Sequence, residues 1–426
     1  MDKKKLLLLG GTRNMKEILD AAHKLDLAVG VTDWYDVKRS PVKLLAEESF
    51  DISILDEEKL DRMIREHHYD GVLTGFTDSY LIPYAEICSR NRLFCYGTRE
   101  QFEILTNKAK YKELFNQYQV PTLETYDPGQ IDERFAHFPI LLKPAEGSGG
   151  NGLRVIADYE KFLAAQSELQ LLVDPAKIII EPYLTQRREM TAFFLFVDGE
   201  VYLTGTANRF LSGTKDTKIG LPLLYSMPAS DDQLFRQHTA PALMRLFRDL
   251  ELKNGMLFAQ CFLHEGVPKV YDLGYRLTGT QEYKLMEQMM GINPLEMMIH
   301  HALSGTMNPS GRVLALDQPA EGYGFNATIL GRVGTIGSIA GEEAIRTLPG
   351  MLDLTLKSAV GDSITDKMVG TLGQIIARVF FTAPTLEAAA ATLQQVYDLL
   401  VITDTSGQDM IVERMDPARL LASYEN

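Results

Sequence analysis

Apolar and polar residues follow two different periods along the first hundred residues. Runs at residues 5–11 (KLLLLGG), 28–33 (AVGVTD) and 71–76 (GVLTGF) have the length and apolar content of buried strands. The segments between and after them, at 14–27, 56–70 and 79–93, carry apolar residues at helical spacing. Strands that alternate with helices in this way predict a parallel α/β unit over residues 1–100.

The pattern changes after this unit. Residues 101–117 (QFEILTNKAKYKELFNQ) predict a helix that ends before Pro121. Apolar runs typical of strands then follow at 139–144, 153–157, 177–184, 189–199 and 200–207. A helix over 242–250 precedes two strands, 256–266 and 268–277, that we expect to pair as a hairpin. Asn293 followed by Pro294 predicts the start of a helix that closes the region near residue 305.

The last part of the chain combines strands with a long helix. Residues 326–341 and 375–383 have strand character, and residues 386–400 (LEAAAATLQQVYDLL) are helical by pattern. The fold class expected for the whole chain is therefore α/β together with α+β. We place domains at 1–100, 101–305 and 306–426.

Composition narrows the possible partners. The formal net charge of −14 argues against a nucleic acid, whose phosphates require a basic surface. The apolar run near the N-terminus holds four leucines, which is too short for a signal peptide, and no 18-residue apolar run occurs that could cross a membrane. With three cysteines and no C-x-x-C spacing, the expectation is a cytoplasmic protein with reduced thiols.

The segment LLKPAEGSGGNGLRVI, residues 141–156, contains the pattern G-x-G-x-x-G at Gly147, Gly149 and Gly152. In a dinucleotide-binding fold this pattern leads from a strand into a helix, but here another strand follows. It is not a Walker A loop either, because Lys143 precedes the glycines. Two interpretations remain, an ordinary mobile hairpin and a loop whose backbone N–H groups and lysine hold phosphate oxygens.

Taken in order, a lysine, a Gly-rich hairpin, a strand that ends in IIIEPYL, Glu189 and a second hairpin resemble the ATP-grasp superfamily. The resemblance covers roughly residues 5–305. The tail from about residue 310 is similar to the C-terminal domain of biotin-carboxylase-like and amino-acid-ligase members. The resemblance implies a pre-ATP-grasp domain, a central ATP-grasp domain and a C-terminal α+β domain, within the three boundaries given above.

The resemblance also implies an ATP site. Lys108 and Lys143 match the two nucleotide-binding lysines, the glycine loop closes over the phosphates, the segment 181–184 reads adenine and Glu189 accepts from the ribose hydroxyls. The implied nucleotide-binding residues are Lys108, Lys143, Gly147, Ser148, Gly149, Gly150, Gly152, Glu181, Pro182, Tyr183, Leu184 and Glu189. For Glu181 and Glu189, the alternative is an acid at the solvated end of a strand.

A metal site is implied within the second hairpin. Gln260 lies five residues after Gly255 and Asp272 lies twelve residues after Gln260, offsets that match carbamoyl-phosphate-synthase-type members. Their oxygen donors suit Mg²⁺, with Mn²⁺ as a substitute. The family pattern Glu-x-Asn-x-Arg reads Asp272, Gly274 and Arg276 here, so one ligand of the family is replaced by glycine. Arg276 is implied to stabilise the transferring phosphoryl group, against the alternative of a structural ion pair.

The activity implied is that of an ATP- and Mg²⁺-dependent carboxylate–amine ligase. It would act on small-molecule substrates through an acyl phosphate, and Arg209 is our candidate for binding the carboxylate, against a structural role. Two alternatives stay open, a carboxylase that forms carboxyphosphate from bicarbonate and an ATP-binding regulatory protein whose catalysis has been lost at Gly274. The resemblance also implies that a homodimer can form.

Overall fold

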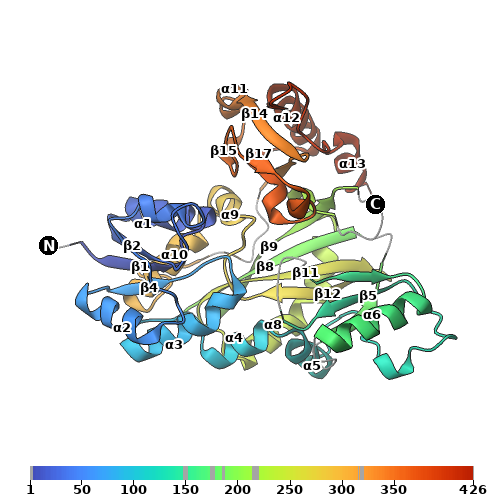
Figure 1. Ribbon diagram of the computed structural model, residues 1–426, viewed down its shortest axis with the longest axis horizontal. Helices are drawn as coiled ribbons and strands as arrows, with labels where there is room; N and C mark the ends of the chain where they lie inside the picture. The colour runs from blue at the N-terminus through green and yellow to red at the C-terminus, as the bar shows by residue number, and fades with distance from the viewer. Residues whose placement is uncertain are drawn as a thin grey trace.

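The computed structural model describes residues 3–146, 152–172, 178–184, 188–213, 220–314, 316 and 321–425, with the side chains of 167–172 left aside. Within these residues the strands form four sheets (Figure 1). An N-terminal sheet lies at one end of the molecule and a small three-stranded sheet lies at the other. A long antiparallel sheet runs between them and continues into the C-terminal region.

The N-terminal sheet consists of parallel strands in the order β3-β2-β1-β4. Its strands are β1 Lys5–Leu9, β2 Ala28–Thr32, β3 Glu48–Phe50 and β4 Gly71–Leu73, and its helices are α1 Lys16–Lys24, α2 Glu57–Glu66 and α3 Leu81–Asn91. Short 3-10 helices occur at η1 Arg13–Met15, η2 Pro41–Leu44 and η3 Asp78–Tyr80. Residues 6–9 are fully buried because β1 is an inner strand with helices packed on the sheet. The predicted parallel α/β unit is confirmed.

Two helices, not one, follow this sheet. They are α4 Arg99–Leu105 and α5 Lys108–Tyr118. The single helix predicted over 101–117 was wrong at Asn107, whose side chain accepts hydrogen bonds from the backbone N–H groups of Ala109 and Lys110 and so begins a new helix. This cap places Lys108 in the first turn of α5.

The small sheet has the order β6-β5-β7 and is antiparallel throughout. Its strands are β5 Ile140–Pro144, β6 Arg154–Ile156 and β7 Ile178–Pro182, and α6 Tyr159–Leu172 follows β6. Because β5 and β6 pair with each other, the glycine segment joins two strands of a hairpin, as its sequence predicts.

The long sheet has eight strands in the order β12-β11-β8-β9-β10-β13-β17-β15. They are β8 Arg188–Val197, β9 Glu200–Leu211, β10 Pro222–Met227, β11 Gly255–His264, β12 Val267–Gly274, β13 Tyr323–Leu330, β15 Met351–Leu356 and β17 Ile375–Ala383. The predicted hairpin appears as β11 and β12. Strands on both sides of residue 306 thus belong to one sheet, while the domain boundary there stays a prediction.

Four helices accompany the central part of this sheet: α7 Asp232–His238, α8 Ala240–Asp249, α9 Tyr283–Met290 and α10 Pro294–Ser304. Asn293 caps α10 through its side chain and Pro294 takes the first position, as predicted. The C-terminal region adds a sheet of the order β16-β14-β18. Its elements are β14 Gly334–Ala340, α11 Glu342–Arg346, β16 Ser363–Ile364, α12 Leu386–Leu399, β18 Val401–Asp404 and α13 Pro417–Ala422.

The largest hydrophobic core joins the N-terminal sheet to the long sheet. It contains residues of β1, β8, β11 and α10, whereas the C-terminal region and the small sheet each have a core of their own. Among the helices that the structure describes, none is both long and apolar enough to span a bilayer.

A buried histidine on α10 makes the stability of the fold depend on pH. His301 is 4% exposed and packs against Phe94, and burial lowers its pKa from 6.5 to about 4. In the unfolded chain His301 binds a proton below about pH 6.5, whereas in the native state it binds one only near pH 4. The free energy of unfolding therefore falls as the pH is lowered through this range. By pH 4.5 the loss due to His301 should reach about 2–3 kcal/mol.

We therefore expect His301→Leu to lose less unfolding free energy than the wild type between pH 7 and pH 4.5, as measured by urea denaturation. His300→Leu is the matched control, because His300 is adjacent on α10 and only partly buried. Equal acid losses in wild type and His301→Leu would show that His301 does not cause this dependence.

Candidate active site

A buried carboxylate lies between the small sheet and α5. Glu181 of β7 is 1% exposed, and its Oε2 is 2.6 Å from the Nζ of Lys143 on β5. Its other oxygen pairs with Lys112 of α5. In the ladder, Glu181 is opposite Leu141, so Lys143, two residues further along β5, has its side chain on the same face. The structure thus brings two of the predicted residues together and adds Lys112, which the sequence interpretation missed.

Lys143 also reaches the hairpin that carries the predicted metal ligands. Its Nζ donates to the backbone oxygen of Tyr271 at 3.0 Å. Lys108 approaches the next residue, with its Nζ 3.7 Å from Oδ1 of Asp272. The hydroxyl of Tyr111 donates to the same carboxylate oxygen at 3.1 Å. Both predicted nucleotide lysines therefore lie beside residues 271–272, although they come from different elements.

Gln260 and Asp272 are directly opposite each other on β11 and β12. Directly opposite residues of an antiparallel pair have side chains on the same face, about 5 Å apart at Cβ. Both residues are partly exposed, so an ion could reach them. An amide and a carboxylate oxygen suit Mg²⁺, which keeps waters and substrate oxygens in its remaining positions. No cluster of three or more His, Cys, Asp or Glu residues suited to a metal occurs in the described part of the chain.

Gly274 departs from the family pattern for a steric reason. A Cβ atom at this position would lie 2.6 Å from Cε1 and Cζ of the Phe258 ring. Phe258 is directly opposite Gly274 in the ladder, is 8% exposed and has the Arg276 guanidinium 5.2 Å from its ring centre. The aromatic ring fills the space that an asparagine side chain would take. Gly274 and Phe258 therefore act as a pair.

This packing predicts that Gly274→Asn loses stability instead of regaining a metal ligand. Overpacking of this kind costs about 1–3 kcal/mol. The cost should shrink in a Phe258→Ala background, where the ring is absent, and a double-mutant cycle by urea unfolding would measure the difference. Equal costs in both backgrounds would show that the ring does not exclude the side chain.

Glu189 and Arg209 form a cross-strand ion pair. They are opposite each other on β8 and β9, and Nη1 of Arg209 is 2.8 Å from Oε2 of Glu189. The hydroxyl of Tyr271 contacts both side chains, and its ring stacks on Phe262 at 4.0 Å. Burial alone would lower the pKa of Arg209, but Tyr271, Tyr225 and Glu189 raise it well above the ordinary value. The predicted ribose acceptor and the predicted substrate arginine are thus in contact.

Arg276 is bound by an acid from the N-terminal region. Its Nε and Nη2 donate to the two carboxylate oxygens of Asp78, in η3, at 2.6 and 2.9 Å. Burial opposes the charge of Arg276, but Asp78 outweighs it and the pKa of the guanidinium is raised. Asp78 lies almost 200 positions away in sequence, and the sequence interpretation did not include it. A role of Arg276 in phosphoryl transfer stays a prediction.

The remaining predicted residues are placed only in part. Gly147, Ser148, Gly149 and Gly150 lie outside the described residues, as do two further basic residues of the loop after β9, Lys215 and Lys218. Gly152 has φ +78°, and a Cβ there would lie 2.8 Å from Cγ of Pro144, so this position requires glycine. Pro182, Tyr183 and Leu184 lie at the end of β7 and are half-buried.

The pairing registers place these side chains on one face of the long sheet. One row contains Asp272, Gln260 and Thr191. A second row, two residues along each strand, contains Phe262, Glu189, Arg209, Tyr225 and Asn326. Since residues two apart on a strand share a face, both rows face the same side. The predicted metal, nucleotide and substrate residues of the long sheet thus share one surface.

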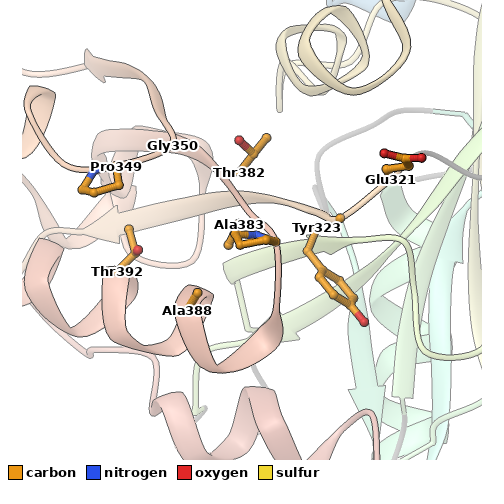
Figure 2. A pocket seen from close by; sticks show the side chains of 10 residues that line it. Glu321, Tyr323, Pro349, Gly350, Thr382, Ala383, Ala388 and Thr392 are labelled. Atoms are coloured by element: carbon orange, nitrogen blue, oxygen red, sulfur yellow. The ribbon is translucent and has the colours of Figure 1, made fainter.

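A separate pocket of about 540 Å³ lies in the C-terminal region, between the ends of β13 and β17 and helix α12 (Figure 2). Glu321, Tyr323, Pro349, Thr382 and Ala388 are among its lining residues, and none of the predicted site residues is. Among the described residues that line it, the charged side chain is the exposed Glu321, so this lining offers no cation to a phosphate group.

Comparison with known sequences finds distant relatives of this chain. No family model matches the sequence. The chain is 23% identical to the uncharacterized protein y4rH of Sinorhizobium fredii, over 93% of this chain and 82% of that protein. It is 28% identical to the formate-dependent phosphoribosylglycinamide formyltransferase of Prochlorococcus marinus, over 39% of this chain, a match that spans less than half (43%) of that enzyme.

Solved structures resemble almost the whole chain. An L-amino acid ligase from Bacillus licheniformis superposes with a TM-score of 0.76 at 17% identity, covering 95% of this chain and 100% of that one. The biotin carboxylase domain of the 2-oxoglutarate carboxylase of Hydrogenobacter thermophilus superposes with a TM-score of 0.74 at 17% identity, covering 95% and 91%. The predicted architecture is therefore confirmed: the chain has the fold of the ATP-grasp superfamily.

Proposed function

We propose that the protein is an ATP- and Mg²⁺-dependent ligase that joins a carboxylate to an amine. The observation that carries the proposal is the meeting of Lys108, Lys143 and the pair Gln260–Asp272 at one end of the β11–β12 hairpin. The two lysines suit the negative charge of a nucleoside triphosphate, and the two side-chain oxygens suit its metal ion. Similarity to an L-amino acid ligase supports the reaction class.

The chemistry proceeds in two steps. A carboxylate oxygen attacks the γ-phosphorus of ATP, a new P–O bond forms, the bond to the β-phosphate oxygen breaks, and ADP leaves. The amine nitrogen then attacks the acyl carbon, the C–O bond to phosphate breaks, and the nitrogen loses its extra protons as the amide forms. Such transfers require positioning and charge neutralisation from the protein, with no covalent intermediate on it.

Each predicted residue has a place in this scheme. Lys108, Lys143, the glycine loop, the 181–184 segment and Glu189 would hold ATP, while Gln260 and Asp272 would hold Mg²⁺. The metal ion would neutralise charge on the phosphate oxygens. Arg209 is proposed to bind the substrate carboxylate through its Nε, a buried atom with no hydrogen-bond partner among the described residues. Arg276, fixed by Asp78, is proposed to stabilise charge on the transferring phosphoryl group.

Two other functions remain in competition. Similarity to a carboxylase domain determined with bicarbonate supports carboxyphosphate formation. The Gly274–Phe258 pair, which removes one ligand of the family pattern, supports an ATP-binding protein without turnover.

One assay separates the three functions. ADP and phosphate release would be measured with Mg²⁺-ATP across amino acids and small carboxylates, singly and in pairs, with bicarbonate as a further substrate. We expect release that requires one carboxylate and one amine, with an amide as product. Release driven by bicarbonate would favour the carboxylase, and ATP binding without release under any condition would favour the regulatory protein.

A further inference from the structure

A second group of polar side chains lies further along the same face of the long sheet. Arg378 of β17 is 3% exposed, and its Nη1 donates to Oγ1 of Thr328 at 3.0 Å and to Oδ1 of Asn326 at 3.4 Å. Both acceptors are neutral. No carboxylate of the described residues forms an ion pair with this guanidinium. An arginine side chain has five N–H donors, so this buried guanidinium can bind an anionic group through its charge and its other N–H groups.

The loop between β12 and α9 faces this group. The side-chain amide of Asn326 donates to the backbone oxygen of Thr280 at 2.6 Å, which fixes the loop against the sheet. Gln281 and Glu282, the next two residues, are both 0% exposed. Among the described residues, neither amide atom of Gln281 has a hydrogen-bond partner, and Oε1 of Glu282 also lacks one. Oε2 of Glu282 accepts from the hydroxyl of Thr278.

Such an arrangement is costly without a ligand. Nearly all buried polar groups in proteins are hydrogen-bonded, and each exception needs an explanation. Gln281 also has φ +64°, a left-handed conformation that is unfavourable for a residue other than glycine. Backbone strain together with orphaned buried polar atoms is typical of a ligand site.

The charges around the group indicate what kind of ligand fits. Burial lowers the pKa of Arg378, while Tyr225 and Glu282 act in the opposite direction, so Glu282 lies within electrostatic range of the guanidinium. A ligand with only negative groups would gain from Arg378 but be repelled by Glu282. A ligand with one anionic and one cationic group satisfies both, and Gln281 can donate to the first and accept from the second.

We infer that Arg378, Glu282 and Gln281 form a subsite for a free amino acid, with its carboxylate at Arg378 and its ammonium group at Glu282. The inference rests on the proposed ligase function, in which this amino acid is the amine substrate. The site lies on the face of the long sheet that carries Gln260 and Asp272. On this face, Tyr225 and Asn326 lie between Arg209 and Arg378. Arg378 and Glu282 thus determine which amine is accepted.

Equilibrium binding tests the inference without turnover. The twenty amino acids would be titrated by calorimetry into the protein loaded with MgADP, followed by two derivatives of the tightest ligand. Removing the carboxylate as the α-amide, or the charged amine as the N-acetyl derivative, should each weaken binding by about 10- to 100-fold, as expected for a lost charged hydrogen bond. No binding by any free amino acid, or derivatives that bind as tightly as the parent, would overturn the inference.

Variants then assign the two ends. Arg378→Gln should bind the free amino acid and its α-amide equally, whereas Arg378→Lys should keep part of the preference for the free amino acid over the α-amide. Glu282→Gln should lose the preference for the free amine alone. Arg414→Gln is the control, since Arg414 pairs with Asp409 at the surface and should leave both preferences intact. An unchanged preference in a variant that still binds MgADP contradicts the assignment of that residue.

The ligase function and the subsite can fail separately. If Mg²⁺-ATP turnover requires a carboxylate–amine pair but amines without a carboxylate serve equally well, the subsite is wrong and the ligase stands. If amino acids bind with the stated preferences but no pair supports ADP release, the subsite stands and the ligase is wrong.

Discussion

Replacing Glu181 with leucine is expected to lower the free energy of unfolding by about 3–5 kcal/mol. The carboxylate is 1% exposed and lies between Lys112 and Lys143, whose side chains are 7% and 5% exposed. Leucine has a similar volume, so the loss comes from two buried ammonium groups that are left without a counter-charge. Burial already lowers the pKa of Lys112, and Glu181 is the group that opposes this effect.

The pH dependence of the loss identifies its cause. Without Glu181 the buried Lys112 loses its proton more easily, because burial lowers its pKa and Glu181 no longer opposes this effect, whereas in the unfolded chain a lysine keeps its ordinary pKa of 10.5. A group with a lowered pKa in the native state gains stability as the pH rises toward the unfolded value. The deficit of Glu181→Leu relative to wild type, measured by urea unfolding, should therefore shrink between pH 7 and pH 10.

Two further proteins control this experiment. Glu265→Gln removes a carboxylate that pairs with Lys269 at the surface and should leave the unfolding transition unchanged. A triple variant, Lys112→Met/Lys143→Met/Glu181→Leu, replaces the whole buried cluster by apolar groups and should recover most of the lost stability, although it would no longer bind a nucleotide. A deficit that stays constant with pH would mean that the lysines are not the cause.

The fold could be predicted from the sequence where the signal is local. The alternation of strands and helices indicated the parallel sheet, and Asn293 with Pro294 marked the start of α10. The eight-stranded sheet could not be predicted, because β10 pairs with β13 and the two are separated by almost a hundred residues. No local pattern specifies a ladder between such distant strands.

The candidate site divides in the same way. The offsets that match the resembled family indicated Gln260 and Asp272 within one hairpin. A count from the turn would place Gln260 opposite Tyr271, so the direct pairing with Asp272 depends on a β-bulge after Gln260 that the sequence did not reveal. Asp78 and Lys112 escaped notice because each meets its partner through tertiary packing. The sequence showed Gly274 as a departure from the family pattern, but the steric reason, the ring of Phe258, became evident only in the structure. Arg378 lies in the strand expected over residues 375–383, and no pattern in the sequence singled it out.

Asp272→Asn is expected to reduce turnover by about 100- to 1000-fold, the usual effect of removing one strong electrostatic contact in an active site. Asparagine keeps the shape of the side chain and an oxygen that can accept from the Tyr111 hydroxyl, so the hairpin should stay folded. The substitution removes the negative charge opposite Gln260. No amide oxygen can compensate at position 274, because Gly274 stands where the resembled family has asparagine. The protein would thus have one neutral ligand, Gln260, for a divalent cation.

A titration of Mg²⁺ distinguishes a ligand from a structural acid. If Asp272 binds the metal ion, the variant needs a higher Mg²⁺ concentration for half-maximal turnover, while its unfolding midpoint stays near that of wild type. Asp404→Asn is the matched control and should change neither quantity, because this carboxylate accepts hydrogen bonds from Ser406 and Gln408 of its own turn. Turnover within tenfold of wild type at every Mg²⁺ concentration would contradict the assignment. The charge beside Lys108 would then serve to position that lysine, and the metal ion would have to be held by oxygens of the nucleotide and by Gln260.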